Sequence, residues 1–245
     1  MAGLRPSRET VGAGAAPSAV PIVALDVPTL ERALALVDLL GDSCRFYKVG
    51  SELFLAAGPR AVVELRERGL EVFLDVKLHD IPNTVRGAAR SAARLGVRLL
   101  TVHASGGRTM MDAAVDGAGE GCGVLAVTVL TSHDAASLAE AWGRGELDVE
   151  AEVLRLADDA RSVGAHGVVC SGAEVAALRA RHGDALRLLV PGLRLGEGAA
   201  DDQARVVTPA AAARAGASYL VLGRTVTGAA DPRAAMASVL RSLGR

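Results

Sequence analysis

The sequence predicts an α/β protein, a single-domain (β/α)8 TIM barrel, and three observations lead to this fold class. Short apolar runs rich in Val, Leu and Ile alternate with Ala-, Leu- and Arg-rich segments of helical periodicity. The runs are almost continuously apolar, as in the strands of a parallel sheet that is covered by helices. The chain has 245 residues, a length at which eight strand–helix units commonly form one domain.

The eight expected strands follow one another from residue 20 onward. They are residues 20–27, 44–50, 70–78, 97–104, 123–131, 167–171, 186–193 and 219–224. A doubly wound open sheet is the alternative architecture. Such sheets usually have fewer strands, and no G-x-G-x-x-G motif follows the first run, so the closed barrel is favoured.

Segments between the strands show the helical periodicity. In residues 29–40, one face is expected to carry Leu30, Ala33, Leu34 and Val37. In residues 173–183, the corresponding face is expected to carry Val175, Ala176 and Leu178, and a glycine ends the pattern. The segment 132–166 is longer than the other connections and contains the only tryptophan, so we expect an extra loop or short helix there.

The first 18 residues differ in composition from the rest of the chain. They are rich in Gly, Ala, Ser and Pro and lack the apolar core of a signal peptide. We expect residues 1–18 to form a disordered tail, followed by one catalytic barrel domain at 19–245. No apolar stretch approaches the ~20 residues that a membrane span needs.

Charge and cysteine content narrow the classes of partner. Lys+Arg 27 against Asp+Glu 28 gives a net charge of −1, so neither a nucleic acid nor a membrane surface is indicated. A small anionic ligand remains compatible, because local charge can differ from net charge. Cys44, Cys122 and Cys170 lie far apart without metal-ligand spacing, which predicts buried thiols in a cytoplasmic protein.

Polar residues and glycines gather where the expected strands end. In a barrel of this type the active site forms at that end, from the loops between strands and helices. The residues found there are Asp26, Lys48, Asp75, Lys77, Asp80, His103, Thr131, Ser132, Pro191, Gly192, Arg194, Gly223 and Arg224. This convergence on one rim predicts an active site.

The stretch FLDVKLHDIPNT (73–84) carries the strongest chemical signal. Asp75 and Lys77 are two residues apart on a strand, so their side chains are expected on the same face. Lys48 lies at the same level one strand away, and Asp80 follows closely. Alternating charges offset one another's desolvation and create a preorganised field. The alternative interpretation is a structural ion-pair network that closes the mouth of the barrel.

The last two strands end in a pattern typical of phosphate sites. Arg194 and Arg224 follow glycines, which let backbone N–H groups approach a ligand, while arginine adds a bidentate clamp. Solvated surface arginines are the alternative. Gln203, in the loop after the seventh strand, is a weak candidate for a residue that reaches the ligand. No cluster with the spacing of a metal site is present in the sequence.

Two further residues near the rim have competing interpretations. His103 in TVHASGG is a candidate base, but a rim histidine bonded to the backbone is the more common case. Thr84, just after Pro82, can hydrogen-bond in the first turn of a helix, which would be structural capping.

With these residues the sequence resembles the orotidine 5′-phosphate decarboxylase family of bacterial pyrimidine synthesis. The similar stretches are VALDV, YKVG, FLDVKLHDIPNT, TVHASGG, VTVLTS, VPGLRL, DDQARVVTP and YLVLGRTVT. They extend from residue 20 to about 235 in the order of the family. DxKxxD alone is shared with related sugar-phosphate enzymes, whereas DxKxHDIPNT together with the last two motifs is specific.

The resemblance implies catalytic roles for four residues. Lys77 corresponds to the lysine that donates a proton, and Asp75 to the carboxylate beside the departing CO₂. Lys48 corresponds to the lysine that holds the ribose and orders the charges. Asp80 corresponds to an aspartate given to the active site of the partner subunit, which implies a homodimer with shared sites.

The resemblance also implies a substrate, orotidine 5′-monophosphate, and a product, UMP, the last step of de novo pyrimidine nucleotide synthesis without metal or organic cofactor. Ribose contacts are implied for Asp26 and Thr84, the latter across the subunit interface. Thr131 and Ser132 correspond to the segment facing the pyrimidine, and the phosphate is expected at Arg194, Gln203, Gly223 and Arg224. Ile81 and Pro191 complete the expected substrate-binding residues.

Two alternatives stay open at the level of sequence. A metal-dependent relative with the same DxKxxD strand, such as a keto-gulonate-phosphate decarboxylase or a hexulose-phosphate synthase, would lose activity in EDTA. A catalytically silent nucleotide-binding protein on a barrel scaffold would bind UMP without turnover. The HDIPNT continuation argues against the first, and a lysine between two carboxylates argues against the second.

Overall fold

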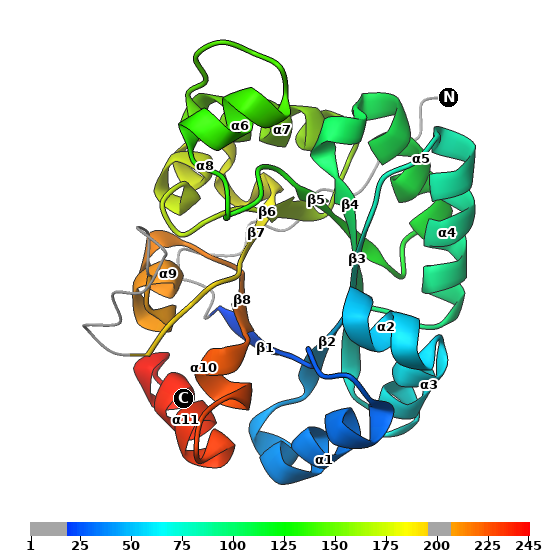
Figure 1. The fold of residues 1–245 in the computed structure, drawn as a ribbon, viewed down its shortest axis with the longest axis vertical. Coiled ribbons are helices and arrows are strands. Elements are labelled where there is room, and N and C mark those ends of the chain that lie inside the picture. The colour runs from blue at the N-terminus through cyan, green and yellow to red at the C-terminus, as the bar shows by residue number, and fades with distance from the viewer. Residues whose placement is uncertain (1–18, 196–206) are drawn as a thin grey trace, which may run out of the picture.

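The computed structural model describes residues 19–195 and 207–245, which form a barrel with helices around it (Figure 1). The strands are parallel and run around the barrel in chain order, and the last one pairs with the first. The predicted fold class is therefore confirmed. The tail expected at residues 1–18 lies outside the described residues.

Each of the eight apolar runs contains one strand. The strands are β1 Val20–Ala24, β2 Phe46–Gly50, β3 Glu71–Leu78, β4 Leu99–His103, β5 Gly123–Val127, β6 Gly167–Val169, β7 Arg187–Val190 and β8 Tyr219–Leu222. Most strands end before the apolar run does, so several polar residues of the predicted rim lie in the loop that follows. β2 and β3 are the exceptions, because each ends where its run ends and carries charged residues of the rim within the strand.

The helices cover the outside of the barrel (Figure 1). They are α1 Leu30–Leu40, α2 Ser51–Ala57, α3 Arg60–Glu67, α4 Pro82–Arg94, α5 Arg108–Ala118, α6 Ala135–Ala141, α7 Val149–Ser162, α8 Val175–His182, α9 Pro209–Ala215, α10 Arg224–Thr227 and α11 Pro232–Ser242. Three short 3-10 helices are Gly41–Ser43, Ala104–Gly106 and Gly183–Ala185. The extra helix expected in the segment 132–166 is α6.

The predicted apolar face of α1 is confirmed, but that of α8 is partly wrong. On α8, Val175 and Leu178 are buried, whereas Ala176 is exposed. A residue one position after Val175 is rotated by about 100° around the helix axis and so leaves the buried face. His182, seven positions after Val175 and four after Leu178, returns to that face and is buried instead.

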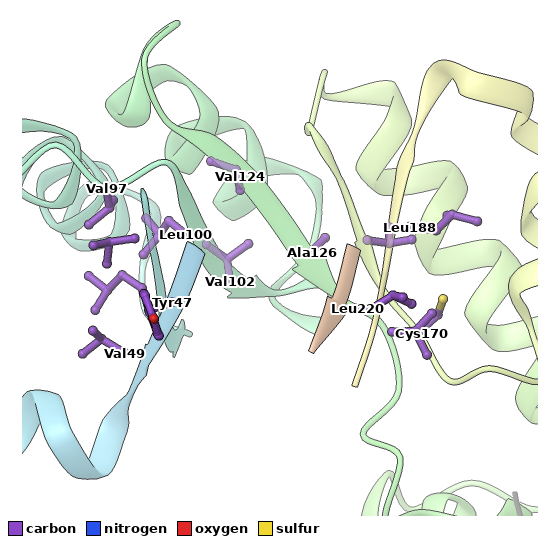
Figure 2. Packing of buried hydrophobic residues seen from close by; sticks show 14 of the residues in the cluster. Tyr47, Val49, Val97, Leu100, Val102, Val124, Ala126, Cys170, Leu188 and Leu220 are labelled. Carbon is purple, nitrogen blue, oxygen red and sulfur yellow. The ribbon is translucent and has the colours of Figure 1, made fainter. Parts of the chain in front are cut away.

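Two layers of apolar side chains stabilise the barrel. The outer layer lies between the strands and the helices, and Figure 2 shows part of it, with side chains such as Val102, Val124 and Leu188 on the strands. The inner layer fills the barrel itself with Ile22, Ala24, Phe46, Phe73, Leu99, Leu125, Leu189 and Val221. Packed on both faces, the strands form a rigid frame that fixes where their ends lie.

The remaining expectations for the whole chain concern cysteines and membrane spans. Cys44, Cys122 and Cys170 are free and buried, as predicted. Burial raises the pKa of the Cys122 thiol to about 11, so it is protonated at neutral pH. In the parts of the chain that the structure describes, no helix combines the length and apolarity that a membrane span requires.

Candidate active site

A cavity of about 560 Å³ lies where the strands end, and residues from both halves of the barrel surround it. Its lining consists of Ala24, Asp26, Lys48, Asp75, Lys77, Pro191, Gly192, Leu193, Arg194, Leu195, Val221, Gly223, Arg224 and Thr225. Charged groups from β2 and β3 thus face the arginines and glycines that follow β7 and β8. Segments far apart in the sequence meet here because parallel strands all end at the same rim.

Four of the charged side chains form a continuous chain of ion pairs. The Lys48 ammonium lies 2.7 Å from Asp26 Oδ1 and 3.5 Å from Asp75 Oδ2. The Lys77 ammonium donates a hydrogen bond of 2.8 Å to Asp75 Oδ1. The order Asp26–Lys48–Asp75–Lys77 alternates in sign, and the formal charges cancel. We call these four residues the charge network.

The interior of the charge network is shielded from solvent. Lys48 is 8% exposed, and the Asp75 side chain is 13% exposed. Burial alone would raise the pKa of Asp75, but the charges of Lys48 and Lys77 and the hydrogen bonds from Lys77 and Thr101 outweigh it and lower the pKa. Asp75 is therefore ionised at neutral pH. The Lys77 side chain, 37% exposed, is the more accessible of the two cations.

Lys77 owes its position to an irregularity in β3. The pairing of β3 with β4 shifts between Leu74, opposite Leu100, and Leu78, opposite Val102. Lys77 has φ +49°, and it is the only non-glycine residue in the described ranges with positive φ. Such a conformation costs about 1–2 kcal/mol and persists only when surrounding structure holds it. The contact with Asp75 was predicted from the alternation of a regular strand, which this backbone does not follow.

Gly50, at the junction of β2 and α2, makes room for one ion pair. A Cβ atom at this position would lie 2.8 Å from Asp26 Oδ1 and 2.8 Å from Lys48 Nζ. Its φ is −87°, so the backbone itself does not require glycine. The lack of a side chain is therefore needed for space, because it lets Asp26 and Lys48 approach each other beside the strand.

The opposite side of the cavity has a different character. Arg194 and Arg224 line it and form no ion pair within the described ranges 19–195 and 207–245. A Cβ atom on Gly223, which precedes α10, would meet no heavy atom of the described residues within 4 Å, so none of these residues fills the space in front of this backbone. The Arg194 N–H donates to the Val207 carbonyl at 3.3 Å, which holds the chain on either side of residues 196–206 together. Gln203 lies outside the described residues.

A second cavity of about 310 Å³ adjoins the first. Thr131 and Ser132 line it, together with residues that follow β5 and β6. Pro191 and Gly192 line both cavities, so the two are neighbours. The polar residues expected to face the pyrimidine therefore lie beside the charged cavity rather than within it.

Three predicted residues stand apart from both cavities. Asp80, Ile81 and Thr84 are exposed at the start of α4, and Ile81 is 66% exposed. Asp80 Oδ1 accepts a hydrogen bond from the Ile81 N–H at 2.6 Å, and Asp80 forms no ion pair with the described part of the chain. The interpretation of Thr84 as a capping residue is wrong, because no side chain of the described residues caps the start of α4.

His103 does not line the cavity either. Its ring lies 5.5 Å from that of His79, between ring centroids, at the ends of β4 and β3. Burial, followed by the positive charges of His79 and Lys77, lowers the pKa of His103. His103 is therefore neutral at pH 7 and adds no charge to the site.

Two contributors to the site were missed by sequence reasoning. Thr101 on β4 is fully buried and hydrogen-bonds to both Asp75 and Lys77, yet it lies in an apolar run without a motif of its own. Gly50 was noted only as the end of YKVG. A compositional signal was also overlooked: Lys48 and Lys77 are the only lysines in the sequence, among 25 arginines.

The described residues contain no group of three or more His, Cys, Asp or Glu side chains arranged to hold a metal ion. Positive charge in the cavity comes instead from Lys48, Lys77, Arg194 and Arg224. Each of these can stabilise an anion by direct contact.

Comparison with known proteins agrees with the resemblance noted in the motifs. The chain is 52% identical over 227 residues to the orotidine 5'-phosphate decarboxylase of Anaeromyxobacter sp. (strain K), covering 93% of this chain and 99% of that protein. It is 50% identical over 221 residues to the orotidine 5'-phosphate decarboxylase of Halorhodospira halophila (strain DSM 244 / SL1), covering 89% of this chain and 93% of that protein.

Solved structures give the same result. A crystal structure of orotidine 5'-phosphate decarboxylase from Lactobacillus acidophilus matches with a TM-score of 0.82 and 38% identity, covering 93% of this chain and 100% of that chain. An uncharacterized conserved protein from Geobacillus kaustophilus matches with a TM-score of 0.77 and 38% identity, covering 91% of this chain and 99% of that chain. Residues 20–239 match the family described as "Orotidine 5'-phosphate decarboxylase / HUMPS family". The chain belongs to this family.

Proposed function

We propose that the protein converts orotidine 5′-monophosphate to UMP and CO₂, the last step of de novo pyrimidine nucleotide synthesis. The observation that carries this proposal is the division of one cavity between a neutral charge network and two arginines without ion-pair partners among the described residues. A substrate with a reacting carboxylate at one end and a phosphate at the other matches this division. The names of the relatives identify such a substrate.

In the proposed reaction, the bond between C6 of the pyrimidine and its carboxylate breaks, and the electron pair stays on C6. The Lys77 ammonium stabilises this developing carbanion and then transfers a proton to C6. Accessibility supports this assignment, because the Lys77 side chain is 37% exposed and that of Lys48 only 10%. The neutral amine left on Lys77 regains its proton from solvent before the next cycle.

The rest of the charge network keeps Lys77 in place and adds to its field. Asp75 accepts a hydrogen bond from the Lys77 ammonium, and Lys48 links Asp75 to Asp26. Because these groups are fixed before the substrate arrives, they need little reorganisation during the reaction. Asp75 next to the substrate carboxylate also favours loss of that group as neutral CO₂.

Phosphate binding on the other side orients the substrate. Arg194 and Arg224, together with the open backbone at Gly223, are proposed to bind the phosphate, with Gln203 as a further contact. Ribose is proposed to lie against Asp26 and Lys48. The pyrimidine then extends towards Pro191, with Thr131 and Ser132 in the adjoining cavity. Binding energy from the phosphate, far from C6, can be used to hold the reacting geometry.

We further propose a homodimer in the cytoplasm in which each subunit completes the site of its partner. Asp80, Ile81 and Thr84 are exposed on one subunit, and Asp80 lacks an ion pair in the described chain. An exposed Ile and a carboxylate without a cation fit an interface that meets the partner's Lys77 and substrate. Mixing equal amounts of inactive Lys77→Ala and Asp80→Ala subunits tests this. About half of the dimers formed by random pairing are heterodimers with one intact site each, so the mixture regains about one quarter of the wild-type sites. An enzyme with self-contained sites regains none.

The proposed activity is tested by the absorbance change of orotidine 5′-monophosphate with the purified protein, with and without EDTA. Rapid conversion to UMP that EDTA leaves unchanged is expected, because the network supplies the charge that a metal would otherwise supply. Activity that is lost in EDTA and restored by Mg²⁺ would favour a metal-dependent member of the same broader family. Binding of UMP without any turnover would show a silent nucleotide-binding protein.

A further inference from the structure

Thr101 occupies an unusual place in the pairing of β3 and β4. Leu74 lies opposite Leu100, and Leu78 lies opposite Val102. The three β3 residues 75–77 therefore share a single β4 partner, Thr101. A regular ladder of backbone hydrogen bonds is interrupted here, as in a β-bulge, and groups in the bulge need other partners.

The Thr101 hydroxyl provides these partners. The Lys77 N–H donates to Thr101 Oγ1 at 2.9 Å, and the Thr101 hydroxyl donates to Asp75 Oδ1 at 3.0 Å. The Lys77 ammonium donates to the same Asp75 oxygen at 2.8 Å. The Lys77 ammonium thus bonds directly to Asp75, and the Lys77 backbone N–H is connected to the same carboxylate through the Thr101 hydroxyl. The resulting ring of hydrogen bonds is closed.

This ring requires a group that accepts and donates at the same time. A hydroxyl does both, whereas the side chain of valine, which has nearly the same shape, does neither. The position is fully buried, so water cannot replace the hydroxyl without a change in packing. Because Lys77 has φ +49°, its backbone needs such support to remain in a sparsely populated conformation.

We propose that Thr101 is a positioning residue that holds the Lys77 backbone in the bulge and directs the Asp75 carboxylate towards the Lys77 ammonium. The effect of Thr101 on turnover rests on the proposed decarboxylase function. The positioning by Thr101 concerns only Lys77 and Asp75, and it is measured without substrate.

Amide hydrogen exchange at Lys77 tests the structural part. Because the sequence has only two lysines, protein labelled with ¹⁵N-lysine gives two backbone signals, Lys77 and the internal reference Lys48. Thr101→Val removes the acceptor of the Lys77 N–H and is expected to speed its exchange about tenfold or more, while Lys48 is unchanged. Thr101→Ser keeps the hydroxyl and is expected to retain the wild-type rate. Equal exchange at Lys77 in all three proteins overturns the proposal.

Kinetics test the consequence for the reaction. Thr101→Val is expected to lower kcat about 10- to 100-fold with little change in KM, because the substrate still binds but Lys77 is displaced. Thr101→Ser is expected to restore most of the loss. Thr128→Val is the matched control: Thr128 is also buried, but its hydroxyl donates to the Val169 carbonyl at 2.8 Å, away from the charge network. It is expected to keep the wild-type kcat.

The pH profile separates positioning from general damage. The charged and titratable groups facing Asp75 are Lys48 from β2, Lys77 from β3 and His103 from β4. The Thr101 hydroxyl adds a hydrogen bond that favours the ionised carboxylate, so its loss raises the pKa of Asp75. As the pH is lowered, the activity of Thr101→Val is therefore expected to begin to fall at a higher pH than the activity of the wild type. That shift is absent if Thr101 only fills space.

The two proposals fail in different ways. If the wild type does not decarboxylate orotidine 5′-monophosphate, the proposed function is wrong, while Lys77 exchange still decides the role of Thr101. If the wild type is active and Thr101→Val matches it in kcat and in the acid limb, the positioning role is wrong. A Thr101→Ser variant as slow as Thr101→Val also contradicts it, because the hydroxyl would then not be the cause. Should Thr101→Val unfold, Thr101→Ala serves as the second hydroxyl-free variant in the exchange and kinetic measurements.

Discussion

The two halves of the rim differ in whether their charged groups have ion-pair partners. At the ends of β1, β2 and β3, every charged group of the charge network has a partner, and the four formal charges cancel. After β7 and β8, Arg194 and Arg224 have no ion-pair partner among the described residues. A group that is fully paired can be held rigidly, whereas a cation left unpaired at a cavity is ready for the charge of a ligand. The paired ions of the charge network thus suit a catalytic role, and the unpaired arginines suit the binding of an anionic ligand.

Replacement of Lys77 by alanine should give the largest effect of any single change in the paired half. General acid catalysis contributes about 10²–10⁴-fold, and a preorganised charge contributes further, so turnover is expected to fall at least about 10⁴-fold. The fold should survive, because the Lys77 side chain is not packed in the core. Absorbance assays and thermal unfolding measure the two properties.

A Lys77→Arg variant sharpens the same test. Arginine keeps the positive charge but does not release a proton at accessible pH. Loss of turnover in both variants supports a proton donor, whereas substantial activity in Lys77→Arg would mean that the charge alone is sufficient. A fully active Lys77→Ala enzyme would remove Lys77 from the mechanism.

In the unpaired half, Arg224→Ala should act on binding rather than on chemistry. A hydrogen bond between charged groups contributes about 1.5–3 kcal/mol, which corresponds to a rise in KM for orotidine 5′-monophosphate of about 10- to 100-fold. The affinity for the phosphate-free nucleoside should hardly change. Arg214→Ala, an exposed arginine on α9, is the control and should leave both constants as they are. Equal weakening of nucleotide and nucleoside would contradict the phosphate role.

The sequence predicted the frame and the charged residues well for a physical reason. Strand periodicity and the common end of parallel strands depend on local patterns, so Asp26, Lys48, Asp75 and Lys77 could be expected on one rim. Retention of lysine at only two positions, in a chain that uses arginine 25 times, is a further signal. Arginine does not release a proton at accessible pH, so a lysine at position 77 fits the proposed proton donor.

The roles of the missed residues, Thr101 and Gly50, depend on contacts that no local sequence pattern indicates. Thr101 acts only because the β3–β4 pairing shifts beside it, and that shift joins residues distant in sequence. Gly50 matters because the side chains of Asp26, in the loop after β1, and Lys48, on β2, meet beside it. On α8, position 176 was assigned to the buried face although the helical period brings His182 there. Register and three-dimensional proximity decide the cases of Thr101 and Gly50, whereas position 176 was an error of helical period.

Gly50→Ala should disturb the paired half without removing any charge. The new Cβ atom would lie 2.8 Å from both Asp26 Oδ1 and Lys48 Nζ, so the ion pair must shift. A displacement of this size is expected to lower kcat/KM about tenfold or more, since misplacement by about 1 Å can cost 10²-fold. Gly87→Ala, at an exposed position of α4 with no atom near the added Cβ, is the control, with unchanged activity and slightly higher stability. Wild-type kinetics in Gly50→Ala would show that the Asp26–Lys48 contact is unimportant.

The smallest expected effect concerns the contribution of Asp75 to stability. Although burial favours the neutral form, Lys48 and Lys77 lower the pKa of Asp75 below its unfolded value. A carboxylate with a depressed pKa stabilises the folded state fully above the unfolded pKa of ~3.9 and loses this contribution as pH falls through the folded pKa. Asp75→Asn lacks the charge at every pH. Its Tm is therefore expected to be a few degrees below that of wild type near pH 6, with a gap that narrows as pH falls below ~4. A gap independent of pH would mean that Asp75 supports the fold by shape and hydrogen bonding rather than by its charge.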